Sequence, residues 1–152
     1  MKSLTFRVDG DPQPGGSKRA FRSASTHKIV VLDDCKRNAA WREHVAWTAK
    51  SAFHAAGYDR PFTGPVALHI RFVKPRPKSH YASRTVGGAL KLAAPLQHLS
   101  APDSSKLFRA CEDALAGILF VNDAQVIEQS ATKCWGKDGC AEITVQCLAD
   151  ET

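Results

Sequence analysis

Two aspartates, Asp103 and Asp123, have the side-chain type and the setting for a hydrolytic metal site. They stand near the two ends of the segment 101–126, APDSSKLFRACEDALAGILFVNDAQV, and a stretch with helical periodicity separates them. Mg²⁺ prefers oxygen ligands and commonly takes only one or two protein carboxylates, together with water and phosphate oxygens. A bound Mg²⁺ can activate water and polarise a scissile phosphate. The chemistry that these residues could support is therefore metal-dependent hydrolysis of a phosphodiester.

Each of the two aspartates also has an ordinary structural explanation. Asp103 precedes two serines at the start of a helix, and its carboxylate could accept the free N–H groups of the first turn. Asn122-Asp123 is equally a normal turn pair. The local pattern alone favours these structural roles.

The distance between the two aspartates depends on how the chain returns after the helix. The helix predicted over 104–116 rises about 20 Å in all. The segment 118–123, if extended, spans roughly 17–20 Å. It can therefore run back beside the helix, and we expect it to bring Asp123 near Asp103.

Two further acids lie within the predicted helix but cannot join Asp103 at one ion in the same subunit. Glu112 and Asp113 are nine and ten residues beyond Asp103. This spacing places them about 13–15 Å away along the helix axis. We expect both to order structure by bonding backbone groups or basic side chains. Ser105, by contrast, could offer its hydroxyl to a metal ion or to a metal-bound water.

The rest of the chain alternates between strand-like and helix-like patterns. Strands are predicted over 3–8, 27–32, 65–73, 124–135 and 141–148, and helices over 35–56 and 104–116. Asp33 or Asp34 is expected to cap the first helix, whose aromatic residues Trp41, Trp47 and Phe53 are predicted as core or dimer contacts. The order of elements predicts one α+β domain over 1–152, with two main helices packed on a mixed sheet and a long basic loop over 74–102.

The composition is typical of one globular domain. The 152 residues are 43% hydrophobic and 24% charged, and their apolar runs are far too short to span a membrane. The N-terminus has no export signal, so we expect a cytoplasmic protein without membrane contact. The five cysteines form no CxxC, which favours reduced thiols over a disulfide or zinc framework. The roles of Cys134 and Cys140, which flank WGKDG, stay open.

The charge distribution favours a polyanionic partner. The formal net charge is +6, and the stretches between Asp11 and Asp33 and between Arg60 and Asp103 contain basic residues but no acids. Such segments around a carboxylate site fit a nucleic-acid-binding surface, although solvated basic loops would have the same composition. The residues predicted to contact nucleic acid are Lys18, Arg19, Arg22, Lys74, Arg76, Lys78, Arg84 and Lys106.

Three motifs follow one another at fixed spacing in the acidic segment. They are Pro102-Asp103-Ser104-Ser105-Lys106-Leu107, Asp113-Ala114-Leu115 and Asn122-Asp123-Ala124-Gln125-Val126. Their order and spacing resemble the RusA family of Holliday junction resolvases, found in phages and prophages. The family pattern reads Pro-Asp-x-Asp-(Asn/Lys)-Leu, then Asp-Ala-Leu within a helix, then Asp-Asp-(Ala/Ser)-Gln-Val. GDPQPGGSKRAF also looks like the family's basic Gly/Pro loop, and RPKSHYASR like the basic segment of its phage members.

The resemblance implies a homodimeric, Mg²⁺-dependent endonuclease that cuts four-way DNA junctions, with Mn²⁺ as a substitute ion. In the family, both Asp of the first motif and the second Asp of the last motif form the metal site, assisted by a Lys. Asp103 and Asp123 match two of these carboxylates and are the expected metal ligands. Ser105 stands at the position of the missing Asp and Arg109 at that of the Lys. We expect Ser105 and Arg109 to tune or assist catalysis, Arg109 by stabilising phosphate charge.

Two other interpretations stay open. Because Ser105 has no carboxylate, the chain could be a catalytically weakened relative that binds branched DNA without efficient cleavage. A basic phage structural or adaptor protein is a third interpretation, and it predicts no preference for branched over linear duplex.

Overall fold

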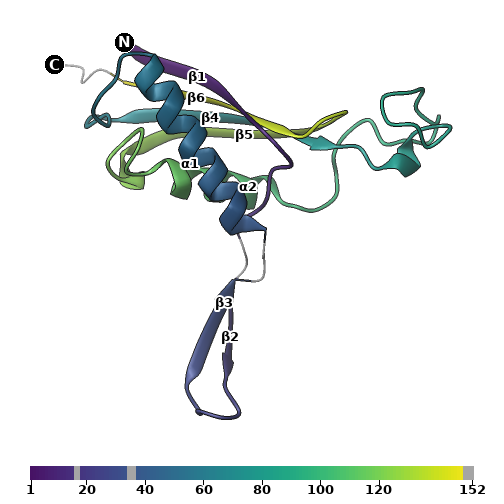
Figure 1. Cartoon of the computed structure of the whole chain (residues 1–152), viewed down its shortest axis with the longest axis horizontal. Helices are drawn as coiled ribbons and strands as arrows, with labels where there is room; N and C mark the ends of the chain where they lie inside the picture. Colours follow the sequence, from purple (N-terminus) through teal and green to yellow (C-terminus); the bar gives the residue numbers. More distant parts are fainter. Residues whose placement is uncertain (16–17, 34–36, 149–152) are drawn as a thin grey trace.

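A four-stranded sheet with two helices packed on one face forms the body of the protein (Figure 1). The computed structural model describes residues 1–15, 18–33 and 37–148. The strand order is β1-β6-β4-β5, and only the β4–β5 pair is parallel. The strands are β1 (Lys2–Asp9), β4 (Val66–Pro75), β5 (Val126–Gly136) and β6 (Cys140–Cys147), and the helices are α1 (Asn38–Ala55) and α2 (Ser104–Leu115). The mixed sheet with two helices confirms the predicted α+β fold.

The alternation of side chains along β4 decides which face of the sheet is buried. Leu68, Ile70 and Phe72 lie in the core beneath the helices. His69 is only half-buried and Arg71 is exposed, because successive side chains of a strand point to opposite faces. The sheet therefore has one apolar face covered by helices and one face open to solvent.

Helix α1 buries the apolar stripe that its sequence predicts. Trp41 and Phe53 are almost fully buried, which confirms them as core residues. Trp47 is 64% exposed, so its assignment to the core is wrong and its role at a dimer contact stays a prediction. No helix in the described part of the chain is long and apolar enough to cross a membrane.

The start of α1 differs from the prediction. Asp33 ends strand β3 (Ile29–Asp33), and the helix begins only at Asn38. Its N-cap is Arg37, whose side chain makes no capping hydrogen bond. Capping by Asp33 is therefore wrong, and Asp34 lies outside the described residues.

Strands β2 (Lys18–Arg22) and β3 form a hairpin that projects away from the body, here called the arm (residues 18–33; Figure 1). They pair antiparallel with each other, from Lys18 opposite Asp33 to Arg22 opposite Ile29. The sequence predicted β3, two residues early, but not β2, which follows a turn-rich Gly/Pro stretch. The arm carries one of the two acid-free basic segments away from the sheet.

The second basic segment forms a long loop beyond the end of the sheet, here called the basic loop (residues 76–102; Figure 1). It contains one short 3₁₀ helix, η1 (Lys78–His80), and returns to the sheet through hydrogen bonds to β5. The Trp135 Nε1–H donates to Gln97 O (3.1 Å), and Lys133 Nζ donates to Ser100 O (2.7 Å). The loop was predicted over 74–102, and in the structure β4 continues to Pro75 before the loop begins.

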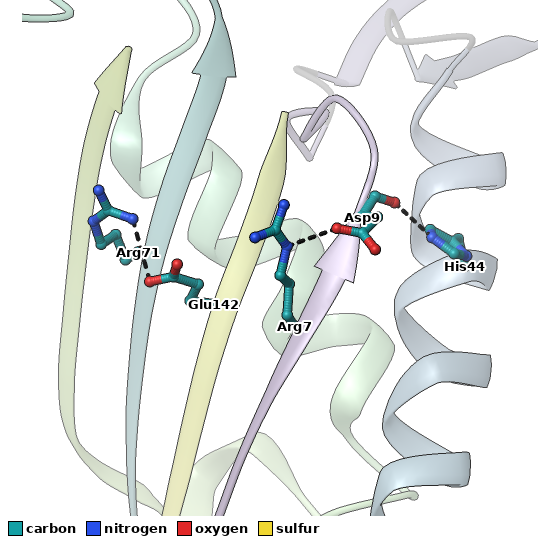
Figure 2. A network of polar contacts seen from close by, with 5 residues as sticks. All are labelled: Arg7, Asp9, His44, Arg71 and Glu142. Carbon is teal, nitrogen blue, oxygen red and sulfur yellow. Dashed lines mark hydrogen bonds and ion pairs between the residues drawn. The ribbon is translucent and has the colours of Figure 1, made fainter. Parts of the chain in front are cut away.

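The face of the sheet that is open to solvent carries a network of polar contacts (Figure 2). Arg7 of β1 and Arg71 of β4 both stand opposite Glu142 of β6. Arg71 Nη1 donates to Glu142 Oε2 (3.2 Å), whereas Arg7 Nε donates to the Asp9 carboxylate (2.6 Å). His44 Nε2 donates to Asp9 O (2.6 Å), which ties α1 to the end of β1. The charges of both arginines are therefore engaged within the sheet.

Three of the cysteines are placed as small apolar residues. Cys111 lies fully buried in α2, and burial raises the pKa of its thiol to about 12. Cys134 and Cys140 lie on the strands flanking β4, and both are opposite Val73. Cys140 is buried and Cys134 half-buried. Packing of these two side chains in the sheet accounts for Cys134 and Cys140 without a role as metal ligands.

Candidate active site

Asp103 lies at the N-terminal end of α2, but its side chain does not cap the helix. Its backbone is extended, and its carboxylate accepts no hydrogen bond from the first turn. The side chain is 65% exposed and lies 3.8 Å from Nζ of Lys106. The prediction that the Asp103 side chain caps the helix is therefore wrong. The carboxylate lies at the surface, with the Lys106 ammonium nearby.

The chain does not leave α2 in the way that the sequence predicted. Residues 117–119 form a tight turn, in which the Gly117 N–H donates to Phe120 O (2.7 Å). Gly117 has a φ of +86°, a left-handed conformation that glycine adopts without steric cost. The 3₁₀ helix η2 (Asp123–Gln125) follows and leads directly into β5. The extended course predicted for 118–123 is wrong.

Strand β5 makes the return, antiparallel to α2. At the start of β5, Gln125 Nε2 donates to Phe62 O (2.8 Å), and the Phe62 N–H donates to Leu119 O (2.8 Å), just after the C-terminal end of α2. Farther along β5, Lys133 Nζ donates to Pro102 O (3.0 Å), just before α2 begins. The two ends of the helix are thus fixed to two separate levels of the strand.

This arrangement separates the two aspartates expected to share an ion. Asp103 lies at the level of Lys133, and Asp123 lies three residues before Val126. Seven residues of strand separate those levels, about 23 Å. The structure therefore places Asp103 and Asp123 toward opposite ends of α2 and does not bring them together within one subunit.

The turn that carries Asp123 is rigidly held. Asn122 Oδ1 accepts a hydrogen bond from the Ala124 N–H (2.8 Å), and Gln125 Oε1 accepts one from the Asn122 N–H (2.8 Å). This reciprocal capping box confirms the turn interpretation for Asn122. Within the described residues, the exposed Asp123 carboxylate has no hydrogen bond or ion pair. The hydrogen bonds of Asn122 and Gln125 fix the turn around Asp123, but no described residue bonds its carboxylate.

An open cleft of about 350 Å³ lies between α2 and the edge strand β5. Ser105, Arg109 and Glu112 line it from the helix, because residues four and three apart fall on one helical stripe. The remaining lining residues are Ser104 and Phe108 of α2 and Gln129, Ser130 and Ala131 of β5. The cleft therefore presents a hydroxyl, a guanidinium and a carboxylate in one row.

Glu112 is the electrostatically perturbed acid of this cleft. Burial raises the pKa of its carboxyl group, and the negative charges of Asp123 and Asp113 raise it further, while Arg109 lowers it. Glu112 lines the cleft, whereas Asp123 is not among the residues that line it.

The cleft has one carboxylate in its lining, that of Glu112, and no larger ligand cluster among the described residues. Among the described residues, no three histidine, cysteine or acidic side chains gather closely enough to hold a metal ion by themselves. A larger cleft of about 740 Å³ lies between the N-terminus and residues 57–63, but Asp59 is the single carboxylate lining it. Mg²⁺ needs only one or two protein carboxylates beside phosphate and water, and Glu112 is the lining residue of the α2–β5 cleft that offers such a ligand.

The basic residues predicted to contact nucleic acid divide into engaged and free groups. Lys74 is almost buried and bonds the Asp11 carboxylate and Pro12 O (2.8 Å), so it holds the 9–15 segment rather than facing solvent. Arg76 donates to Pro95 O (2.7 Å) and lies over the ring of Trp135, which orders the basic loop. Arg22, Lys78, Arg84 and Lys106 are exposed, and the side chains of Lys18 and Arg19 lie outside the described set.

The base of the arm lies against α2 next to the cleft. The Gly15 N–H donates to Lys106 O (2.8 Å), and a Cβ at position 15 would come within 3.3 Å of that carbonyl and 3.6 Å of the Arg109 side chain. A side chain at position 15 would therefore need its neighbours to shift slightly, and no local pattern in the sequence predicts this contact. The segment that leads to the arm thus lies next to the cleft.

Comparison with known proteins agrees with this geometry. The family model described as "Endodeoxyribonuclease RusA" matches residues 9–146, nearly the whole chain. The protein belongs to the RusA family. RusA proteins act on branched DNA, and membership implies Holliday junction resolvase activity. The chain is also 23% identical over 150 residues to the uncharacterized protein YqaN of Bacillus subtilis strain 168, covering 96% of this chain and 97% of that protein.

RusA membership confirms the resemblance carried by the three motifs, but the motifs did not reveal the role of position 112. Sequence reasoning assigned Glu112 to backbone or basic partners because it is too far along the helix from Asp103. The structure places it in the cleft beside Arg109. The spacing of Ser105, Arg109 and Glu112 on one helical stripe was the signal that could have indicated this.

Proposed function

We propose that the protein is a Mg²⁺-dependent, structure-selective endodeoxyribonuclease that resolves four-way or other branched DNA junctions by phosphodiester hydrolysis, with Mn²⁺ as a substitute ion. The observation that carries the proposal is the open cleft formed by the acidic motif region, with Ser105, Arg109 and Glu112 in one row. Family membership supplies the substrate class. The proposed setting is the cytoplasm of a bacterial host, with a phage or prophage as the source of the gene.

The donor atoms at the cleft fit a hard divalent cation. Carboxylate oxygens stand at both ends of α2, from Asp103 at its start and Asp123 beyond its end, and the Ser105 hydroxyl lies between. We retain Asp103 and Asp123 as proposed metal-binding residues; because they lie toward opposite ends of α2 within one subunit, each would hold an ion together with phosphate and water oxygens. When bound, Mg²⁺ supplies an activated water and charge neutralisation at the phosphate.

Arg109 has the chemistry to bind the phosphate group in this cleft. A guanidinium can donate two parallel hydrogen bonds to phosphate oxygens. It has no hydrogen bond or ion pair to another side chain in the described part of the protein. Ser105 beside it is exposed and can donate a hydrogen bond to the same group. These two side chains would therefore orient the scissile phosphate.

The proposed DNA-binding surface extends from the cleft to the arm and the basic loop. Arg22, Lys78, Arg84 and Lys106 are exposed and are proposed to contact phosphates. Lys18 and Arg19 are proposed for the same role at the base of the arm. Neutralising several phosphates releases counterions, so binding should weaken steeply as salt concentration rises.

A homodimer is proposed because junction resolution needs two cuts. Two-fold symmetry would give two equivalent clefts on one molecule of junction DNA. The exposed Trp47 on α1 is a candidate for the contact, since aromatic residues are enriched in interfaces. Light scattering of the full chain would measure the oligomeric state directly.

The decisive experiment is cleavage of synthetic four-way junctions with Mg²⁺ or Mn²⁺. Wild-type protein should nick the junction, and Asp103→Asn should slow cleavage by at least about 100-fold, equivalent to about 2.7 kcal/mol. Asp113→Asn, an exposed acid on the same helix outside the cleft, is the matched control and should cut at the wild-type rate. Absence of cutting by wild type, or full cutting by Asp103→Asn, would sink the proposal.

The weakened-relative alternative gives a different pattern. It predicts tight, structure-selective junction binding without any metal-dependent product. A gel-shift titration with four-way and linear DNA, run beside the cleavage assay, separates the two. Equal binding to four-way and linear duplex would instead support the structural or adaptor interpretation.

A further inference from the structure

A second cavity lies where the basic loop returns to β5, and it shares no lining residue with the α2–β5 cleft. Its volume is about 370 Å³, near the lower end of the range for small-ligand pockets. This cavity, here called the loop pocket, has no acid in its lining, which is made by His80, Pro95, Gln97, Leu99, Ser100 and Trp135. The loop pocket is therefore a separate site with aromatic and apolar walls and a few polar groups.

Trp135 forms a fixed aromatic wall of the loop pocket. Its Nε1–H donates to Gln97 O (3.1 Å). The ring of His98, a residue that is almost fully buried, packs on the indole with the two ring centroids 4.1 Å apart. The His80 ring meets the same indole edge to face, at 5.1 Å between centroids. The orientation of the indole is therefore set before a ligand arrives, which lowers the entropic cost of binding against it.

Leu99 lines the same pocket but is left almost entirely to solvent. It is 88% exposed, in a stretch that carries two further exposed leucines, Leu92 and Leu96. A large apolar side chain beside a cavity gains free energy when a ligand covers it. DNA-binding proteins use apolar side chains of this kind to contact bases at disrupted steps of the stack.

The charges around the loop pocket select the kind of ligand. The basic loop contains no acid, whereas its Lys78, Arg84 and Lys91 are exposed. The Arg76 guanidinium lies 5.8 Å from the centroid of the Trp135 ring. These cations would add nothing to the binding of an apolar peptide. A nucleobase, by contrast, is joined to a phosphate chain that the cations attract.

We infer that the loop pocket binds one unpaired nucleobase of DNA. The flat base contacts the Trp135 indole and the Leu99 side chain, while the exposed cations of the basic loop bind the flanking phosphates. A base in a linear duplex must leave its stack and its partner to enter the pocket, so the pocket favours DNA with unpaired bases at a branch point. The inference deepens the proposed nuclease function and rests on it for the identity of the ligand as branched DNA.

The test compares two single strands of the same length and charge, roughly 12 nucleotides each, one of thymidine and one of abasic nucleotides. Fluorescence anisotropy measures their binding to the full chain in EDTA, where no metal-dependent cut occurs. Wild type should bind the thymidine strand at least about 10-fold more tightly, because stacking on an aromatic ring favours a base over an abasic sugar.

Variants at the two apolar walls locate this preference in the loop pocket. Leu99→Ala should reduce it at least about 3-fold, whereas Leu92→Ala, an exposed leucine of the same loop outside the pocket lining, should keep it. Trp135→Ala should remove the preference, and Trp135→Phe, which keeps a flat ring, should retain most of it. Binding of the abasic strand should change less than about 2-fold in Leu99→Ala, because phosphate contacts do not involve a leucine.

An unchanged preference in Leu99→Ala would overturn the inference, and so would an equal loss of affinity for both strands. If Leu99 instead contacts a second copy of the chain, Leu99→Ala would change the oligomeric state in light scattering and leave the preference intact, which also overturns it. Junction cleavage by a wild type that binds both strands equally would refute the loop pocket but not the nuclease proposal. A preference that Leu99→Ala removes, in a wild type that cuts no junction, would support the loop pocket and refute the nuclease proposal.

Discussion

Lys133 holds the start of α2 in place, and its removal gives a sharp test of how the cleft is built. Its ammonium donates to Ser100 O (2.7 Å) and to Pro102 O (3.0 Å), the two carbonyls that precede Asp103. Hydrogen bonds from charged donors contribute about 1.5–3 kcal/mol each when their partners cannot be rehydrated. The bond to Ser100 is exposed and the other part-buried, so Lys133→Met should cost about 2 kcal/mol in total.

The assay is reversible urea or thermal unfolding of the full chain. A loss of about 2 kcal/mol corresponds to a fall of roughly 4–8 °C in Tm for a domain of this size. Lys91→Met is the control, because Lys91 is exposed in the basic loop and its side chain has no polar partner among the described residues. Hydrogen exchange should quicken in the segment before α2 but not in the core strands.

The same variant tests whether the placement of Asp103 matters for cleavage. Lys133→Met should disturb Asp103 and reduce junction cleavage. A stability change below about 0.5 kcal/mol would refute the anchoring role, since that is the scale of ordinary surface substitutions.

Substitutions in the cleft, in the basic loop and in the core should each have a further measurable effect. Burial and the charge of Asp123 raise the pKa of Glu112, so ionisation opposes folding and stability should fall as pH rises above the unfolded value of 4.5. In urea unfolding across this pH range, Glu112→Gln should flatten that decline, and an unchanged slope would contradict the assignment. Ser105→Asp should tighten Mn²⁺ binding several-fold in a titration that follows the paramagnetic resonance signal of the free ion, and no gain would mean that position 105 does not reach the ion. Arg84→Ala should reduce the slope of log binding constant against log salt by about 1, measured by fluorescence anisotropy with junction DNA. Leu115→Ala, at a fully buried position, should cost about 2–5 kcal/mol in unfolding free energy.

Periodicity made the body of the fold predictable. The apolar stripe through Trp41 and Phe53 specifies α1, and alternation specifies β4, because burial of one face is the main driving force for both. The two final strands and α2 follow the same logic. Family motifs then fixed the order of these elements around the acidic segment.

Contacts between distant residues were not predictable in this way. Strand β2 follows a turn-rich Gly/Pro stretch and pairs with β3 in a projecting arm, so no local pattern predicted it. Trp47 has the composition of a core residue but points to solvent, which only the packing of α1 decides. The engagement of Lys74 by Asp11 joins residues 63 positions apart, and no local pattern encodes it.

The position of Asp123 was wrongly predicted. The length of segment 118–123 allowed the chain either to run back beside α2 or to turn at the end of the helix. An extended segment could have crossed α2, but Gly117 permits a left-handed turn that ends the helix at once. The Asn122–Gln125 capping box then starts β5 from the same end. The segment 118–123 was therefore long enough to bring Asp123 to Asp103. The turn after α2 directs the chain elsewhere, so the two residues stay apart.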